Sequence, residues 1–185
     1  MILFLDGMVF NSRMDGSTSV DDLLTKVKLL LTSHNTISIA STQEKKVSAA
    51  SVFYVSDTNL NIYFLSFDKS THSKNIFKNR NIAATINKDV EDWSDIKGLQ
   101  IKGYSEKLDI HQREEVLNRY KRKFKYLDQI INAPKNSNEQ KIAEQFQTIS
   151  VFVFTPIFLR LIDNSLGFGK KMELTRANGE WLRTS

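Results

Sequence analysis

The stretch from Val47 to Gly103 constrains the fold most strongly, because short β patterns there alternate with a single short helical pattern. Apolar and polar residues follow the two-residue period of half-buried strands, and polar turns such as Asp57-Thr-Asn59 separate the runs. Gly98 and Gly103 indicate a bulge or a close approach of the backbone. The pattern predicts, in order, strands over 47–56 and 60–67, a helix over 71–79 that turns Ile76 and Phe77 inward, and strands over 81–87 and 97–108.

Helical and strand patterns flank this central stretch on both sides. Ser19 and Asp22 form a capping box, and the apolar residues that follow recur at helical spacing, so a helix covering one side of the core is expected from Val20 to Ser33. A change to helical period after residue 109 predicts a long helix that ends near Leu127. The other expected elements are a strand over 36–42, a helix over 138–147, a strand over 150–162 that Pro156 breaks, and a turn-rich loop over 163–170.

Length and composition indicate one folded unit. The chain has 185 residues, enough for a single core, and we expect one domain over 19–185 preceded by a weakly ordered extension over 1–18. No apolar run approaches the roughly 20 residues of a membrane helix, and the interrupted apolar start at Met1 makes a poor signal peptide. The sequence holds no cysteine, which excludes disulfides and Cys-based zinc sites and fits a cytoplasmic protein.

The start of the helix expected over 71–79 offers groups that can bind a phosphate. Helix starts carry unpaired backbone N–H groups and the positive end of the helix dipole. Lys74 adds a positive charge there, in line with the net charge of +5, and hydroxyls come from Ser66, Ser70, Thr71 and Ser73. A plain structural role stays open, in which Ser70 or Thr71 only caps the helix.

Short blocks between Leu30 and Leu108 carry a family resemblance through their order and spacing. The blocks are Leu30-Leu31, Ile37 to Thr42, Val47 to Val55, Ile62 to Ser66, Thr71 to Ile76 and Ile96 to Gly103. In this order they resemble the flavin-binding split-barrel superfamily that includes pyridoxamine 5'-phosphate oxidase. The last two blocks, together with Asp163 to Gly169, look most like a small uncharacterised bacterial group within that superfamily.

The resemblance implies a mainly β fold, a six-stranded antiparallel split barrel of the FMN-binding type with flanking helices. It implies FMN as the cofactor, and it places Ser51, Val52 and Phe53 along the flavin ring system. The residues implied at the FMN phosphate are Ser66, Thr71, His72, Ser73 and Lys74, where His72 takes the place of an arginine that the family oxidases carry. Taken alone, Ser51 to Phe53 form a plain core strand, and a lone histidine is more often a surface residue.

Two further residues connect the expected site to a second subunit. In the resembled family, a glutamine at the position of Gln100 reaches the flavin of the neighbouring subunit, so the resemblance implies a homodimer with flavin sites at the subunit interface. Trp93, in the polar loop before it, is expected to stack near the flavin ring or to seal the dimer. An outward-facing strand residue is an equally good interpretation of Gln100.

The expected function is that of an FMN-dependent oxidoreductase acting on an unknown small molecule. A flavin supplies its own reactive chemistry, which suits a sequence without a recognisable acid–base pair. A non-enzymatic module that binds or senses a flavin or haem is the alternative. Pyridoxamine 5'-phosphate oxidase activity itself is not expected, since Gly179 to Arg183 only faintly resembles the substrate segment of those oxidases.

Other functions find little support in the sequence. The run from Arg119 to Lys125 interleaves basic and aromatic residues as RNA-binding surfaces do. Tyr120 and Phe124 belong to the apolar face of the expected helix, however, which leaves the charges on a solvated face. Neither nucleic acid nor a membrane is therefore an expected partner. Hydrolase, zinc-protease and dinucleotide motifs are absent, so the sequence predicts no metal site and no particular catalytic residue.

Overall fold

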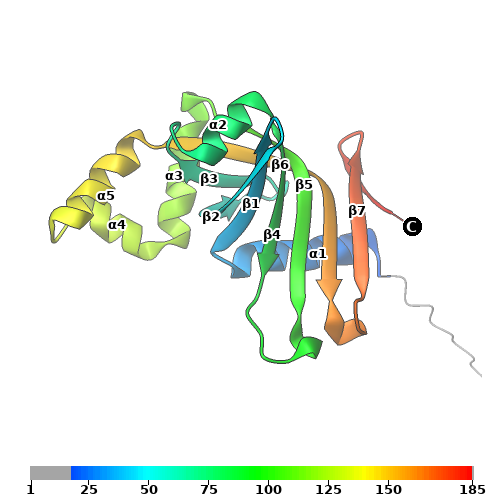
Figure 1. Ribbon diagram of the computed structural model, residues 1–185. Coiled ribbons are helices and arrows are strands. Elements are labelled where there is room, and N and C mark those ends of the chain that lie inside the picture. The colour runs from blue at the N-terminus through cyan, green and yellow to red at the C-terminus, as the bar shows by residue number, and fades with distance from the viewer. Residues whose placement is uncertain (1–17, 185) are drawn as a thin grey trace, which may run out of the picture.

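A computed structural model describes residues 18–184 of the chain (Figure 1). Apart from Thr18, the extension expected over 1–18 lies outside the described residues. The helices are α1 (Val20–Ser33), α2 (Thr71–Lys78), α3 (Ile110–Lys123), α4 (Lys125–Asn132) and α5 (Ser137–Thr148), with 3₁₀ turns η1 (Trp93–Asp95) and η2 (Asn164–Leu166). The strands are β1 (Thr36–Gln43), β2 (Lys46–Ser56), β3 (Ile62–Ser66), β4 (Asn81–Asn87), β5 (Lys97–Lys107), β6 (Ser150–Asp163), β7 (Lys171–Ala177) and β8 (Glu180–Arg183).

Strands β1 to β6 form an antiparallel barrel. Their order is β3-β2-β1-β4-β5-β6, and pairing between β3 and β6 closes the ring. Strand β6 pairs with two different strands along one of its edges. Residues 150–154 pair with β3, and residues 158–162 pair with β7. The expected six-stranded antiparallel barrel with flanking helices is thereby confirmed.

Strands β7 and β8 are not among the expected elements. β7 extends the sheet from β6, and β8 pairs with β7 in a hairpin. Asn178 and Gly179 form its turn with φ angles of 52° and 86°. An Asn-Gly pair favours this left-handed conformation in tight hairpins, so the dipeptide is the sequence signal that points to the missed hairpin.

Gly103 lies at a close approach between the backbones of β5 and β6. The register between the two strands shifts after Lys102, and Pro156 lies opposite Gly103. A Cβ atom on Gly103 would lie 2.1 Å from the carbonyl oxygen of Thr155, so only glycine fits. The expected bulge is confirmed, whereas the expected break at Pro156 is wrong, because β6 runs through it as one strand.

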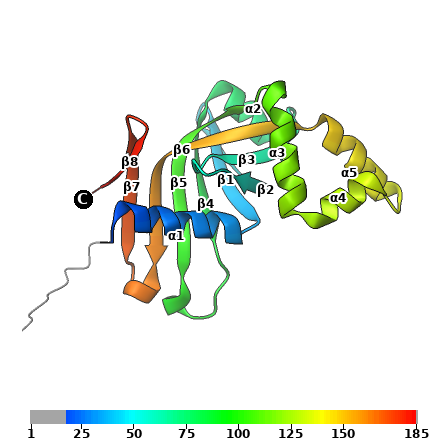
Figure 2. The ribbon, with the colours of Figure 1, turned by 180° about the vertical axis from the view of Figure 1, so that it is seen from behind.

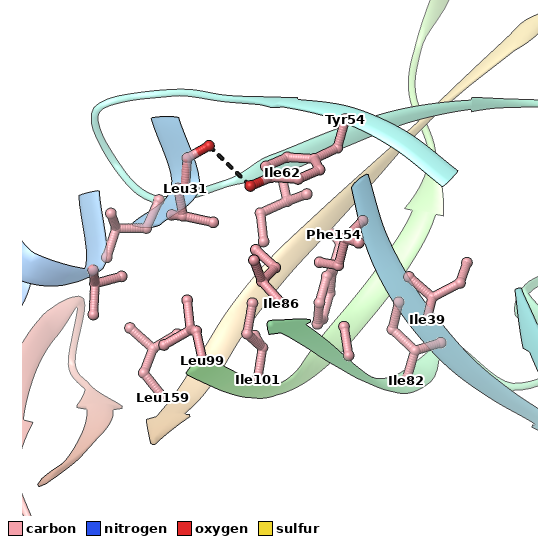
Figure 3. Packing of buried hydrophobic residues seen from close by; sticks show 14 of the residues in the cluster. Leu31, Ile39, Tyr54, Ile62, Ile82, Ile86, Leu99, Ile101, Phe154 and Leu159 are labelled. Carbon is pink, nitrogen blue, oxygen red and sulfur yellow. Dashed lines mark hydrogen bonds between the residues drawn. The ribbon is translucent and has the colours of Figure 1, made fainter. Parts of the chain in front are cut away.

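The main core fills the barrel, and α1 lies across the strands on one side (Figure 2). This helix begins with the expected capping box, in which the Asp22 N–H donates to the Ser19 hydroxyl at 3.1 Å. The Tyr54 hydroxyl donates to the carbonyl of Leu31 at 2.9 Å and ties the end of α1 to β2 (Figure 3). The buried stripe of α1 consists of Leu23, Val27 and Leu31.

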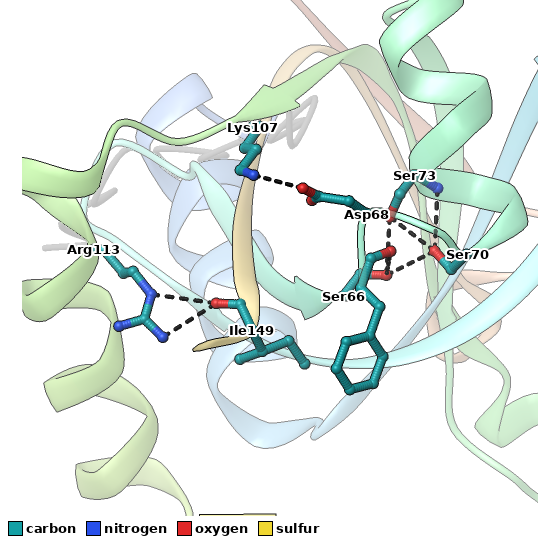
Figure 4. Close-up of polar contacts among 8 residues, drawn as sticks. Ser66, Asp68, Ser70, Ser73, Lys107, Arg113 and Ile149 are labelled. Atoms are coloured by element: carbon teal, nitrogen blue, oxygen red, sulfur yellow. Dashed lines mark hydrogen bonds and ion pairs between the residues drawn. The ribbon is translucent and has the colours of Figure 1, made fainter. Parts of the chain in front are cut away.

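Helices α3, α4 and α5 form an arm beside the barrel with a second, smaller apolar cluster. The helix expected to reach Leu127 ends at Lys123 instead, because Phe124 departs from helical conformation with a ψ of 79°. The side chain of Arg113 on α3 caps the end of α5 (Figure 4). Its guanidinium donates to the carbonyl oxygens of Phe146, Gln147 and Ile149 at 2.9, 2.9 and 3.2 Å.

The basic run differs from its expected arrangement at one position. Tyr120 and Phe124 are buried, as their place on the apolar stripe predicts. Lys123 is only partly exposed, and its ammonium donates to the carbonyls of His34 at 2.6 Å and Tyr54 at 3.1 Å. Burial lowers the pKa of Lys123 to about 8. Lys123 therefore joins α3 to the end of α1 and to β2 instead of lying on the solvated face.

Candidate functional site

The expected phosphate site lies at the turn between β3 and α2, at one end of the barrel (Figure 1). β3 ends at Ser66, and Ser70 is the N-cap of α2, with its hydroxyl accepting a hydrogen bond from the Ser73 N–H at 3.3 Å. Ile76 anchors the helix on the core with 1% of its surface exposed. Phe77 is 49% exposed, and its ring centroid lies 5.8 Å from that of the buried Phe152, so it faces the core only in part.

Ser66, Ser70 and Ser73 form a hydrogen-bonded hydroxyl cluster under this turn (Figure 4), and the ring of His72 joins it. The Ser70 hydroxyl donates to that of Ser73 at 2.8 Å, and the Ser73 hydroxyl donates to that of Ser66 at 3.0 Å. The Ser66 hydroxyl lies 2.7 Å from Nε2 of His72. Ser66 and Ser73 are 6% and 0% exposed. Two of the hydroxyls expected at a phosphate are therefore buried and committed to the cluster.

The groups at this turn that do reach the surface are Thr71, Lys74 and the first backbone N–H groups of α2. Both side chains are exposed. Within residues 18–184, the N–H groups of Thr71 and His72 have no hydrogen-bond partner, because they belong to the first helical turn. Unpaired N–H groups beside a lysine fit a phosphate. The geometry thus keeps Thr71 and Lys74 at the candidate site and substitutes backbone N–H groups for the buried serines.

His72 contacts the hydroxyl cluster through its ring nitrogen Nε2. The Ser66 hydroxyl lies 2.7 Å from Nε2 of His72, 2.9 Å from the Ser70 hydroxyl and 3.4 Å from the Phe67 carbonyl oxygen. Which atom donates between Ser66 and His72 depends on the tautomer of the imidazole. Burial lowers the pKa of His72 below its ordinary value of 6.5. This environment disfavours the charged form that would replace an arginine at a phosphate.

Mild acid is expected to destabilise the fold through His72. Its pKa is lower in the folded protein than in the unfolded chain, so the unfolded chain binds the proton first. The contribution of neutral His72 is fully present above about pH 6.5 and is lost as the pH falls from there toward the lowered pKa. Urea unfolding at a series of pH values should show a larger loss of stability in wild type than in His72→Gln. Parallel losses in the two proteins would contradict this account.

The β2 residues expected along the flavin ring divide between the two faces of the strand. Ser51 and Phe53 are exposed, whereas Val52 packs against the barrel core. β2 pairs with β3 only from Tyr54 to Ser56, so among the described strands residues 46–53 leave that edge of β2 unpaired, except that the Phe53 carbonyl accepts a hydrogen bond from the Tyr120 hydroxyl. Ser51 and Phe53 can therefore meet a ligand with their side chains, and the unpaired edge can meet it with backbone groups.

Gln100 belongs to a polar row that crosses the outer face of three strands. The register places it opposite Arg160 of β6, which in turn lies opposite Glu173 of β7. The Arg160 guanidinium donates to the Glu173 carboxylate at 2.6 Å and to the amide oxygen of Gln100 at 3.2 Å. Within the described part of the chain, no hydrogen bond uses the NH₂ group of Gln100, which is exposed. The row depends on strand register, so no local sequence signal reveals it.

Trp93 lies in the loop between β4 and β5, at the end of the barrel opposite α2 (Figure 1). Its ring packs edge-on against Phe168, with ring centroids 5.7 Å apart. The side-chain amide of Asn164 donates to the Trp93 carbonyl at 2.8 Å and fixes the two loops together. Within one subunit the structure does not bring Trp93 to the start of α2.

Small residues cover the outer face of β1, β2, β4 and β5, which we call the small-residue face. Its first hollow, of about 410 Å³, is floored mainly by Ser38, Ala40, Ala49, Ala83 and Thr85 and edged by Gln100, Lys102 and Phe158. A second hollow of about 440 Å³ continues along the same face, and Ala83 and Lys102 line both. Exposed apolar side chains border the second hollow, with Val47 at 79% and Ile157 at 42% exposure.

The described residues limit the other kinds of site that this part of the chain can hold. Residues 18–184 contain no cluster of side chains that could ligate a metal ion. No helix in the same range is long and apolar enough to cross a membrane. Every buried side-chain nitrogen or oxygen atom in that range has a hydrogen-bond partner, so no orphaned buried atom marks a further ligand site there.

Known proteins resemble this chain in sequence. No protein-family model matches the sequence. The UPF0306 protein YhbP of Escherichia coli O157:H7 is 25% identical over 159 residues, which cover 85% of this chain and 97% of that protein. The UPF0306 protein YhbP of Salmonella paratyphi C is 26% identical over 165 residues, which cover 89% of this chain and 96% of that protein.

Solved structures share the fold. A proposed pyridoxamine 5'-phosphate oxidase from Listeria innocua has a TM-score of 0.56 at 16% identity, covering 75% of this chain and 97% of that one. HutZ, the heme storage protein from Vibrio cholerae, has a TM-score of 0.55 at 13% identity, covering 71% and 88%. An FAD-binding protein from Mesorhizobium loti has a TM-score of 0.55 at 11% identity, covering 73% and 88%.

The chain therefore has the fold of the pyridoxamine 5'-phosphate oxidase-like split barrels. Within that class, its sequence is similar to the bacterial UPF0306 proteins. The resemblance expected from the residue blocks is confirmed by both comparisons.

Proposed function

We propose that the chain binds FMN and uses it to oxidise or reduce a small molecule. The observation that carries this proposal is the start of α2, where the unpaired N–H groups of Thr71 and His72 lie beside Lys74. Helix α2 contacts β2, whose unpaired edge at 46–53 supplies backbone groups for a flavin ring. The fold that this chain shares with an FAD-binding protein and a heme storage protein supports the proposal.

Each group at the candidate site has a role that follows from its chemistry. The Lys74 ammonium and the N–H groups of the first turn of α2 would bind the phosphate, and the Thr71 hydroxyl would add a donor. The edge of β2 would hydrogen-bond the polar side of the ring system, and Phe53 would pack beside it. A bound flavin supplies the electron-transfer chemistry, so the chain need only bind and orient its reactants.

We further propose a cytoplasmic homodimer that buries the small-residue face. Small side chains allow two sheets to approach closely, and the exposed Val47 and Ile157 add apolar area around them. In such a dimer the free NH₂ group of Gln100, oriented by Arg160, would donate to the flavin of the second subunit. Trp93 would likewise reach the second subunit, since it lies far from α2 of its own chain.

Lys74→Ala is expected to raise the Kd for FMN at least about tenfold, because a charge-assisted hydrogen bond to phosphate is worth about 1.5–3 kcal/mol. Quenching of FMN fluorescence during titration measures the change. Lys78→Ala is the matched control, since it removes an exposed lysine from the last turn of the same helix. Wild type and Lys78→Ala should bind alike. Equal affinity of wild type and Lys74→Ala for FMN would contradict the placement of the FMN phosphate at the start of α2.

A module that binds flavin or haem without turnover is the second candidate function. One observation favours it: among the described residues, His72 is the only titratable ring at the start of α2, and its burial in the hydroxyl cluster lowers its pKa and disfavours its charged form. Steady-state oxidation of a reduced nicotinamide separates the candidates, because a storage or sensing protein binds its cofactor without sustained turnover. Absorption spectra recorded after addition of haemin identify the haem variant of this role.

A further inference from the structure

A pocket of about 330 Å³ lies between the helical arm and the outer side of β2 and β3, and we call it the arm pocket. Ser51 to Phe53 and Leu65 form its barrel side. All three arm helices, or the residues at their ends, form its other walls. Half of its ten lining residues are aromatic, namely Phe53, Tyr120, Phe124, Tyr126 and Phe146.

The barrel side of the arm pocket is fixed, whereas its outer wall is open. The Tyr120 hydroxyl donates to the carbonyls of Phe53 at 2.7 Å and Tyr63 at 3.1 Å, which locks α3 onto two strands. The rings of Phe53 and Phe124 meet edge-on with centroids 5.3 Å apart. Helix α4 has no buried residue, and Tyr126 is 48% exposed. A ligand can therefore enter from the α4 side without displacing the core.

The lining defines the chemistry of a ligand. None of the ten lining residues carries a charge at neutral pH, and the Tyr120 hydroxyl is already committed to two carbonyls. A charged ligand would lose its hydration without gaining a partner. Aromatic walls favour a flat ring that makes edge-to-face or stacked contacts. We propose that the arm pocket binds a small, uncharged aromatic molecule, with Ser51 and Tyr126 as the polar groups at its rim.

The arm pocket also bears on the proposed flavin site. Ser51 and Phe53 belong both to its lining and to the edge of β2 proposed for the flavin ring. The molecule in the arm pocket then lies next to the flavin. The substrates of the protein are accordingly small, uncharged aromatic molecules, an assignment that rests on the proposed function. Binding of the aromatic molecule to the arm pocket does not itself require the flavin.

The test uses N-phenyl-1-naphthylamine, an uncharged aromatic dye whose fluorescence increases in apolar surroundings. The whole chain is titrated with the dye, with and without FMN. Leu127→Trp, which fills the pocket, should weaken binding about tenfold or more, and Tyr126→Ala, which removes an exposed wall, about threefold. Phe168→Ala is the control, because it removes an 85% exposed aromatic ring outside the pocket, and it should bind as wild type.

The outcomes separate the inference from the proposed function. Saturable binding that weakens in both pocket variants and persists in the presence of FMN supports a substrate pocket beside the flavin. No saturable binding by wild type, or equal affinity in all four proteins, overturns the inference while leaving FMN binding intact. Competition between dye and FMN overturns it as well, because the pocket would then hold the flavin ring. If the dye binds and FMN does not, the aromatic ligand site in the arm pocket is supported and the proposed FMN-dependent function is contradicted.

Discussion

Gly103→Ala should lower the free energy of unfolding by about 3 kcal/mol, the upper range for overpacking a tight interior. The added Cβ atom would lie 2.1 Å from the carbonyl oxygen of Thr155 and 3.0 Å from Cα of Pro156. Both neighbours are backbone atoms of β6, so relief requires the two strands to move apart where β6 changes partner from β3 to β7. Urea unfolding followed by circular dichroism measures the loss.

Gly98→Ala is the matched control on the same strand. A Cβ atom there would lie 2.8 Å from Oδ1 of Asn87, the end of an exposed side chain that can turn away, and 3.3 Å from the carbonyl oxygen of Ile86, a much milder backbone contact than at Gly103. We expect this substitution to cost less than about 1 kcal/mol. Similar stability losses for the two variants would show that the crossing of β5 and β6 is not specially constrained.

Ala83→Arg should convert the proposed dimer to monomers. Ala83 lies between the two hollows of the small-residue face, so a bulky charge there would prevent close approach and would be desolvated in the interface. Placing like charges across a two-fold interface costs several kcal/mol, so dissociation should increase about 100-fold or more. Light scattering coupled to size-exclusion chromatography measures the mass in solution.

Ala177→Arg on β7 is the control, because it places the same charge on an exposed position outside both hollows. It should remain a dimer with unchanged FMN affinity. The Ala83→Arg monomer should lose FMN affinity as well, since the proposed sites lie between subunits. A wild-type monomer, or a dimer that survives Ala83→Arg, would contradict the proposed interface.

Elements with strong local signals could be predicted from the sequence. The capping box at Ser19 and Asp22 and the apolar spacing after it define α1, whose observed bounds are Val20–Ser33. Alternation of Ile82, Ala84 and Ile86 against exposed or partly exposed neighbours defines β4. In both elements the alternation of buried and exposed positions follows from neighbouring residues in the sequence. The element can therefore be predicted without knowing which distant segments it contacts.

Elements that depend on distant partners could not be predicted in the same way. In β7 only Met172 and Leu174 are buried, and charged residues surround them, so the alternation is too short to stand out. The long helix breaks at Phe124 because its ring is buried between the arm and β2, a tertiary contact that overrides helical period. The Asn178-Gly179 turn was the one local signal in this region.

The candidate site likewise combines features that follow from local sequence with features that depend on distant contacts. The turn at Ser70 and the exposed Lys74 follow from local sequence. Burial of Ser66 and Ser73 does not, because their hydroxyls satisfy one another through a cluster that only the folded turn creates. The arm pocket is also tertiary. Tyr120 and Phe124 are a plain apolar stripe in sequence, and they line a pocket only because α4 and α5 stand away from the barrel.

FMN titration of the purified wild-type protein tests the central claim most directly, with its visible absorption spectrum recorded before any cofactor is added. The account predicts flavin absorption bands in the purified protein or saturable binding of one FMN per subunit, with a Kd of about 1 μM or below. A site with a binding free energy of only about −5.5 kcal/mol would be half filled at about 100 μM FMN. No binding at that concentration would contradict the account.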